Sequence, residues 1–160
     1  MIGPDEFRRV LGHFATGVTI VTTSDADGRP SGLTVSAFAS LSLDPPLVLV
    51  CLDHKSQTYP ALRDHGRFAV NVLTTGQEAL SRRFASTQID KFDGLPCRMS
   101  ELGLPLLTAA LVHLECVTVA THVEGDHTIF VGRVERTGVN DGDPLLYYRG
   151  RYQRLSTAPP

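Results

Sequence analysis

Runs of β-branched residues, joined by connections too short for a crossover helix, constrain the fold of this chain most strongly. Val18–Thr23 is β-branched throughout, and Val112–Val123 is separated from Thr128–Thr137 by a short connection that contains Gly125 and Asp126. β-branched side chains favour strands, and a short glycine-containing connection is typical of antiparallel hairpins. Parallel neighbours would need a dozen or more connecting residues. The pattern therefore predicts an antiparallel sheet rather than alternating strands and helices.

Further segments have the composition of strands. They are Pro30–Leu43, Leu47–Leu52, Phe68–Leu73 and Leu145–Tyr148. The turn signal Asp25–Gly28 predicts that residues 18–43 form one hairpin, and the apolar run Leu47–Leu52 is typical of a strand buried on both faces. Together the segments predict a mainly β protein with peripheral helices, a six- to seven-stranded antiparallel barrel.

Three short helices are expected outside the strands. Apolar residues at helical spacing predict an N-terminal helix over residues 4–15, with Pro4 in its first turn. The second is expected over Ser56–Asp64, with Ser56 as its N-cap, and the third over Gly76–Ala85. All three would lie around the barrel, which we expect over about residues 17–155.

Composition and charge limit the classes of function. A length of 160 residues suits a single domain over residues 1–160, and a net charge of -2 disfavours a nucleic-acid partner. The longest apolar run, Leu47–Leu52, is too short to span a bilayer, and the first residues do not resemble a signal peptide. Cys51, Cys97 and Cys116 are widely spaced, which favours a reducing cytoplasmic location without structural zinc.

Common nucleotide-binding and catalytic motifs are absent from the sequence. It contains no Gly-x-Gly-x-x-Gly, no P-loop, no Gly-x-Ser-x-Gly and no His-Glu-x-x-His. Its six histidines show no metal-ligand spacing, so we expect no metal site. If the chain is an enzyme, a cofactor is expected to carry the chemistry.

A segment rich in small polar residues is the first candidate binding surface. Because alternate residues of a strand face one side, one face would carry the small residues Gly32, Thr34, Ser36, Ser40 and Ser42, interrupted by Phe38. Such a face has room for a flat ring and offers hydroxyl groups to it. A solvent-exposed face that binds nothing would show the same pattern.

The second candidate surface is Asp53–Ser56, which follows a predicted strand and begins a predicted helix. Free backbone N–H groups, the Ser56 hydroxyl and the helix dipole would together form an anion site, with Lys55 beside it. A strand followed by a helix cap is also common without any ligand. The basic group Arg149, Arg151 and Arg154 is either a solvated chain end or an anion contact.

Several segments match a known family in order and spacing. They are Phe14–Thr22, Gly32–Pro46, Phe68–Leu73, Gly125–Val134 and Pro144–Tyr152. Together, over residues 7–155, they resemble the short-chain flavin reductases that serve two-component flavin-dependent monooxygenases. The resemblance implies a Greek-key split β-barrel that binds FMN or FAD, commonly as a homodimer with the flavin near the subunit interface. It also implies that reduced flavin passes to a separate monooxygenase.

The resemblance also implies site residues. Those expected along the edge of the isoalloxazine ring are Thr34, Val35, Ser36 and Ala37. Those expected around the ribityl phosphate are Ser40, Ser42, Asp53, Lys55 and Ser56. Phe84 and Ala85 are expected to continue the wall of the site around the ribityl phosphate, and Lys91 and Phe92 are expected to lie close to the flavin. His127 would face the nicotinamide as the one catalytic candidate, with Tyr152 and Arg154 near the same cleft.

The residues and the resemblance together predict an NAD(P)H-dependent flavin reductase. It would transfer hydride from NADH or NADPH to FMN or FAD and supply reduced flavin to a partner monooxygenase. One alternative is a flavin- or haem-binding split barrel without turnover, and another is an oxidoreductase of the same fold that acts on a corrinoid or a pyridoxine phosphate. The sequence leaves open the choice between FMN and FAD and between NADH and NADPH.

Overall fold

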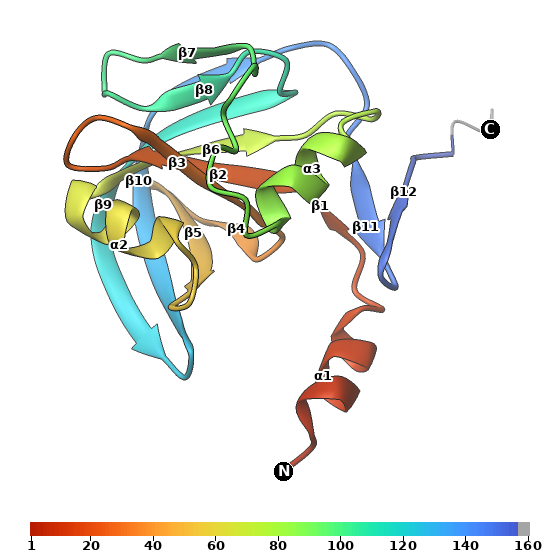
Figure 1. The fold of residues 1–160 in the computed structure, drawn as a ribbon. Coiled ribbons are helices and arrows are strands. Elements are labelled where there is room, and N and C mark those ends of the chain that lie inside the picture. The colour runs from red at the N-terminus through yellow and green to blue at the C-terminus, as the bar shows by residue number, and fades with distance from the viewer. Residues whose placement is uncertain (157–160) are drawn as a thin grey trace.

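Antiparallel strands dominate the chain, and three short helices lie around them (Figure 1). The structure, a computed structural model, describes residues 1–156. The strands are β1 (Thr16–Gly17), β2 (Thr19–Ser24), β3 (Pro30–Val35), β4 (Phe38–Leu43), β5 (Pro46–Asp53), β6 (Arg67–Val72), β7 (Cys97–Met99), β8 (Pro105–Leu107), β9 (Val112–Glu124), β10 (His127–Val139), β11 (Leu146–Tyr148) and β12 (Arg151–Gln153). The helices are α1 (Pro4–Leu11), α2 (Thr58–His65) and α3 (Glu78–Ala85).

Seven strands form one large antiparallel sheet, in the order β3-β2-β6-β9-β10-β5-β4. Its longest ladder joins β9 to β10, from Val112 opposite Val139 to Glu124 opposite His127. Two smaller sheets, β1-β11-β12 and β7-β8, lie beside it. The prediction of a six- to seven-stranded, mainly β architecture is confirmed.

The two edge strands of the large sheet, β3 and β4, follow one another in the chain. Ser36 and Ala37 lie between them, and the Cys51 N–H of β5 donates a hydrogen bond to the Ala37 carbonyl at 3.1 Å. The sheet must therefore roll up until its two edges meet at this crossing. The crossing protects edge backbone groups that would otherwise be open to other chains.

The prediction of one hairpin over residues 18–43 is wrong. β2 pairs with β3 only as far as Val35, and β4 pairs with β5 instead. A register shift between Ser40 and Ser42 further changes which side chains of β4 share a face. The small polar residues of the segment therefore do not share the one strand face that the alternation predicts, because they are divided between β3 and β4.

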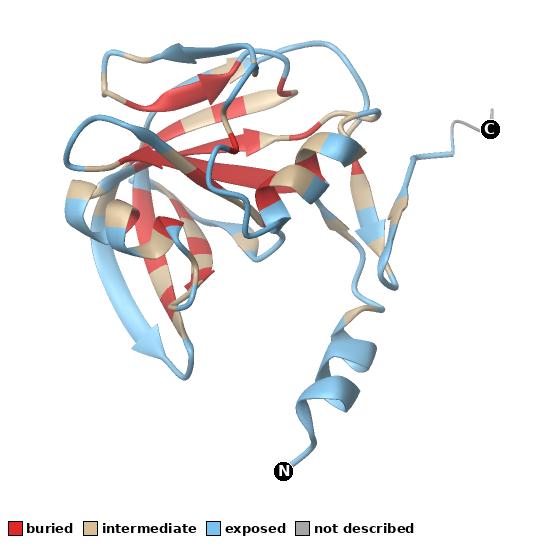
Figure 2. Cartoon of the chain, viewed as in Figure 1, coloured by how far each residue is buried: buried red, intermediate tan, exposed pale blue. Residues whose placement is uncertain are grey.

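The interior of the rolled sheet holds the largest buried cluster (Figure 2). Its buried members are Val21, Val35, Val48, Val50, Leu52, Leu62, Phe68, Val70, Cys116 and Phe130. Leu62 comes from α2, which closes one end of the interior. A second cluster packs under α3 around Phe84, which is 1% exposed.

β5 is buried on one face only, so the prediction that both faces are buried is wrong. Val48, Val50 and Leu52 point into the core, whereas Leu49 and Cys51 on the other face are half-buried. The apolar run therefore supplies one core face and one face with access to a pocket.

The helices are shorter than predicted. α1 ends at Leu11 rather than at residue 15, projects from the body, and has no buried residue (Figures 1 and 2). α2 begins at Thr58, and its N-cap is Gln57 rather than Ser56. α3 begins at Glu78 because Gly76 adopts a positive φ of 94°. None of the helices within residues 1–156 is long and apolar enough to cross a membrane.

Gly132 of β10 offers a test of the core packing. A Cβ at this position would meet the Phe68 ring and would lie 2.9 Å from Cβ of Cys116. We expect Gly132→Ala to lower the free energy of unfolding by about 1–3 kcal/mol because the core is overpacked. Urea denaturation measures this, with Gly17→Ala as control, since no atom lies within 4 Å of a Cβ there. Equal midpoints for the two variants would contradict the packing described.

Candidate functional site

A pocket of about 350 Å³ brings together many of the predicted site residues. It lies between the end of β5, β3 and the end of α3, and we call it the Lys55 pocket. Its lining consists of Leu33, Thr34, Asp53, Lys55, Ser56, Gln57, Phe84, Ala85, Ser86, Thr87 and Lys91. Seven of the predicted flavin-binding residues are among them.

Most backbone N–H groups of the turn that follows β5 donate hydrogen bonds to acceptors in the same turn. The Lys55 N–H donates to Oδ1 of Asp53 at 2.8 Å, and the Ser56 N–H donates to the Asp53 carbonyl at 3.0 Å. The Thr58 N–H donates to Oγ of Ser56 at 3.1 Å. These three N–H groups are therefore not available to an anion, and the predicted anion site would depend on other donors of the same turn. Asp53 shapes the turn, and its carboxylate is unsuited to touch a phosphate.

The Lys55 side chain supplies the positive charge of the pocket instead. Within residues 1–156, its ammonium group forms no salt bridge. The Gln57 N–H also lacks a hydrogen-bond partner in this part of the chain. A flexible cation and one backbone donor are therefore available to an anionic ligand.

Lys91 lines the same pocket but serves a different purpose. It is only 8% exposed, and its Nζ donates to the carbonyls of Phe84 at 3.1 Å and Gly32 at 3.4 Å. Burial lowers the pKa of its ammonium group. Lys91 thus fastens the loop after α3 to β3, where the carbonyl end of the helix favours a cation.

The face of β3 with Gly32 and Thr34 is covered by α3. A Cβ at Gly32 would lie 2.9 Å from Cε1 of Phe84, and Oγ1 of Thr34 donates to the Ser81 carbonyl at 2.6 Å. The Tyr152 hydroxyl donates to Oγ of Ser81 at 2.8 Å, which ties β12 to the same helix. A flat ring therefore has no room over this part of β3.

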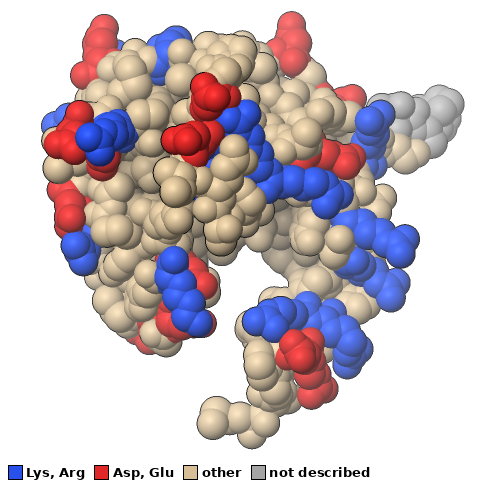
Figure 3. Space-filling model, viewed as in Figure 1, with Lys and Arg blue, Asp and Glu red and all other residues tan. Residues whose placement is uncertain are grey.

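A second pocket, of about 690 Å³, lies further along the same strands, between the crossing and α1. We call it the Ala37 pocket. Its lining consists of Phe7, Arg8, Leu11, Gly12, Phe14, Thr16, Ser36, Ala37, Phe38, Ala39, Leu49, Cys51, Tyr147 and Gly150. Figure 3 shows the open hollow between α1 and the body of the molecule.

The two pockets share one face of β5. Leu49 and Cys51 line the Ala37 pocket and Asp53 lines the Lys55 pocket, and alternate residues of a strand share a face. Leu49 and Cys51 were missed from the sequence, although their positions four and two residues before Asp53 place all three on one face of a strand. Small and apolar side chains therefore adjoin a cationic pocket along one strand.

Other predicted residues lie outside both pockets. Val35 is 5% exposed and its side chain belongs to the core, so its predicted place beside the flavin stays a prediction that rests on its backbone alone. Ser40 and Ser42 lie on β4 and line neither pocket, although Phe38 and Ala39 at the start of the same strand line the Ala37 pocket. Phe92 packs edge-on against Phe84, with ring centroids 5.0 Å apart. Arg154 follows β12 and is exposed.

His127 begins β10 directly opposite Asp53 of β5, so it lies beside the Lys55 pocket. Its Nδ1 hydrogen-bonds to Oδ1 of Asp126 at 2.7 Å, and this bond lowers the pKa of the Asp126 carboxyl. The His54 N–H donates to the Asp126 carbonyl at 3.0 Å. The turn is therefore held in place while the imidazole remains partly open to solvent.

The two pockets suit a ligand with a planar, largely apolar ring and an anionic tail. The ring matches the small and apolar lining beside Ala37, and the tail matches the free cation of Lys55. Within a rolled antiparallel barrel, this combination defines a candidate site for a flavin nucleotide.

Comparison with known proteins agrees with this description. The chain belongs to the flavin reductase family, because the flavin reductase like domain matches residues 11–156. A relative from Rhodococcus jostii, the reductase subunit HsaB of a flavin-dependent monooxygenase, is 46% identical over 152 residues, which cover 94% of this chain and 77% of the relative. An NADH-dependent flavin reductase from a Rhodococcus species is 42% identical over 159 residues, covering 96% and 88%.

Solved structures share the fold. Nitrilotriacetate monooxygenase component B from Mycobacterium thermoresistibile has a TM-score of 0.91 at 42% identity, covering 98% of this chain and 89% of its own. The NADH:FAD oxidoreductase SgcE6 of Streptomyces globisporus, in complex with NAD and FAD fragments, has a TM-score of 0.92 at 37% identity, covering 100% and 99%. The predicted split barrel is confirmed.

The buried position of Lys91 predicts a pH-dependent stability. Because burial lowers the pKa of Lys91 in the folded chain below its ordinary 10.5, the unfolded chain binds more protons between these two values. The cost of burying the charge is present in full at neutral pH and is released as the pH rises toward 10.5. We expect wild type to gain stability relative to Lys91→Met over this interval. Urea midpoints for both proteins at about pH 7.5 and about pH 10 measure it, and a constant difference would contradict the assignment.

Proposed function

We propose that this chain is an NAD(P)H-dependent flavin reductase that supplies reduced flavin to a separate monooxygenase. The family match over residues 11–156 supports the activity, and the relatives named as reductase components of monooxygenases support the partner. The observation that carries the proposal is the pair of adjoining pockets, one apolar and one cationic, on one face of β5. We further propose a cytoplasmic location, since Cys51, Cys97 and Cys116 are unpaired.

We place the isoalloxazine ring in the Ala37 pocket and the ribityl phosphate in the Lys55 pocket. Ser36 and Ala37 would border the ring, because the backbone crosses there without large side chains. Lys55 and the Ser56 hydroxyl would bind the phosphate. Thr34 would hold α3 against β3 through its hydrogen bond to the Ser81 carbonyl. Tyr152 would act on the site only through Ser81.

A bound flavin supplies the hydride acceptor, so the reaction requires no protein nucleophile. The chain would hold the ring against the crossing, exclude water from its buried side, and orient the nicotinamide with His127. Asp126 keeps the imidazole in one orientation through its bond to Nδ1. This leaves Nε2 free to face a ligand.

We also propose that the working form is a homodimer. The apolar side chains of α1 and of the turn after it are exposed, by 49% to 74%: Phe7, Val10, Leu11 and Phe14. α1 also forms one open wall of the Ala37 pocket, so a second copy packed there would bury these residues and close the pocket. Sedimentation analysis tests this, and a monomer would leave the ring site open to solvent.

The activity itself is tested by following the oxidation of NADH and of NADPH with purified protein. We expect nucleotide oxidation to depend on added FMN, FAD or riboflavin. A parallel sample without flavin measures the background rate. If neither nucleotide is oxidised faster with any flavin, the chain is not a flavin reductase.

His127 is expected to affect hydride transfer more than flavin binding. We expect His127→Ala to slow flavin reduction by about tenfold or more, because the nicotinamide loses an orienting contact, and to change the flavin Kd by less than about twofold. Rapid-mixing absorbance measures reduction, and a binding titration measures the Kd. His122→Ala is the matched control, since His122 is exposed on β9 of the same hairpin. An unchanged reduction rate would remove His127 from the site.

A further inference from the structure

His54 lies between the two turns that the proposed function uses. One turn follows β5 and carries Lys55, and the other leads from β9 into His127 at the start of β10. The backbone N–H of His54 donates to the Asp126 carbonyl at 3.0 Å, and Nε2 of its ring lies 2.9 Å from Oγ1 of Thr128. His54 therefore bonds to the residue before His127 and to the residue after it.

The contacts of Thr128 decide which atom donates in the ring hydrogen bond. Oγ1 of Thr128 donates to the Tyr59 hydroxyl at 3.3 Å. A hydroxyl group has a single proton, so Oγ1 must accept the bond from His54, and Nε2–H of His54 is the donor. Thr128 is only 2% exposed, so water has almost no access to replace the imidazole.

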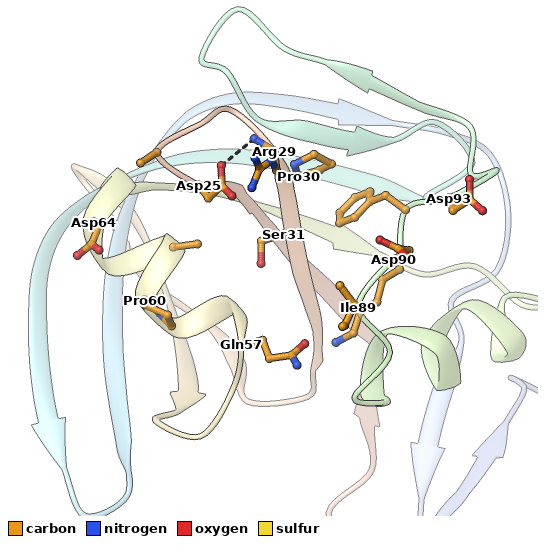
Figure 4. Close-up of a pocket in the computed structure, with 14 residues that line it drawn as sticks. Asp25, Arg29, Pro30, Ser31, Gln57, Pro60, Asp64, Ile89, Asp90 and Asp93 are labelled. Carbon is orange, nitrogen blue, oxygen red and sulfur yellow. Dashed lines mark hydrogen bonds between the residues drawn. The ribbon is translucent and has the colours of Figure 1, made fainter.

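The His54 ring is also held by packing against α2. Its centroid lies 5.0 Å from that of Tyr59, and Tyr59 packs edge-on against Phe130 of the core with centroids 6.0 Å apart. A different face of α2, which carries Pro60 and Asp64, lines a groove of about 1130 Å³ that Tyr59 does not line (Figure 4). The core side of α2 therefore supports the ring that bonds to Thr128.

The bond to Thr128 determines where the His127 side chain begins. The two residues are consecutive in β10, so their side chains point to opposite faces of the sheet. Asp126 orients the imidazole of His127 through the bond to Nδ1 at 2.7 Å, but it lies on the same turn and moves with it. His54 belongs to the other turn, so its two bonds fix the position of His127 relative to the Lys55 pocket.

We propose that His54 is a positioning residue for hydride transfer. It lines neither the Ala37 pocket nor the Lys55 pocket, and it acts through β10 by holding His127 in register with the turn that binds the flavin phosphate. The inference deepens the proposed function and rests on it. A flavin held at Lys55 and a nicotinamide oriented by His127 then meet at a fixed separation.

Two substitutions separate the hydrogen bond of His54 from its ring packing. His54→Phe keeps an aromatic ring beside Tyr59 and removes the donor to Thr128, whereas His54→Gln keeps an amide donor and removes the ring. We expect His54→Phe to slow flavin reduction about fivefold with the flavin Kd within about twofold, and His54→Gln to restore the rate to within about twofold of wild type. Rapid-mixing absorbance and a binding titration measure these, with His122→Phe as the control that changes neither.

The same measurements distinguish positioning from general support of the site. In a protein that already carries His127→Ala, His54→Phe should slow reduction by less than about twofold, because the residue through which it acts is gone. An equal loss of rate in both backgrounds would overturn the inference. It is also overturned if His54→Gln is as slow as His54→Phe, or if His54→Phe weakens flavin binding as much as it slows reduction.

Amide hydrogen exchange without substrates separates this inference from the function on which it rests. We expect His54→Phe to speed exchange at residues 126–129 about tenfold, and His54→Gln to keep it near wild type. If wild type reduces no flavin, the proposed function fails and the positioning role fails with it. If wild type is active but His54→Phe leaves this exchange unchanged, the proposed function stands and the positioning role alone is refuted.

Discussion

The closure of the sheet at Ser36 and Ala37 is the constraint on which the rest of the structure depends. The hydrogen bond from the Cys51 N–H to the Ala37 carbonyl joins the β3 edge to β5. This closure brings residues that are far apart in the sequence, such as Thr34 and Asp53, to one pocket. Without it, β3 would be a free edge strand. The two pockets would not form, because each is lined by residues of β5 and of the segment around the crossing.

Burial assigns different roles to the two lysines of the candidate site. Lys91 lies almost completely inside, bonded to backbone carbonyls, and its lowered pKa reflects the cost of that position. Lys55 lines an open pocket, and its ammonium group forms no salt bridge within the residues described. Two residues of one type therefore support the same site differently, one by holding a loop and one by offering charge to a ligand.

The fold was largely predictable from the sequence, and the point of failure has a physical cause. Alternation and β-branching report whether a segment is extended, and they located nearly every strand of the large sheet. They do not report which strand a segment pairs with, because pairing depends on contacts distant in sequence. The crossing after Val35 therefore looked like the middle of one strand, and the short pair Cys97–Met99 and Pro105–Leu107 was missed.

By itself, the sequence determined an antiparallel barrel, its family, and most residues of the Lys55 pocket, because strand period and motif spacing are local properties of the chain. Only the tertiary structure decided that Val35 belongs to the core and that Ser40 lies beyond the crossing. It also decided that the Asp53 carboxylate accepts a hydrogen bond from the Lys55 N–H of its own turn. It also revealed a groove of about 1130 Å³, whose walls come from three separate segments, residues 25–31, 57–64 and 89–93. Burial and hydrogen-bond partners depend on how distant segments pack, and no local pattern carries that information.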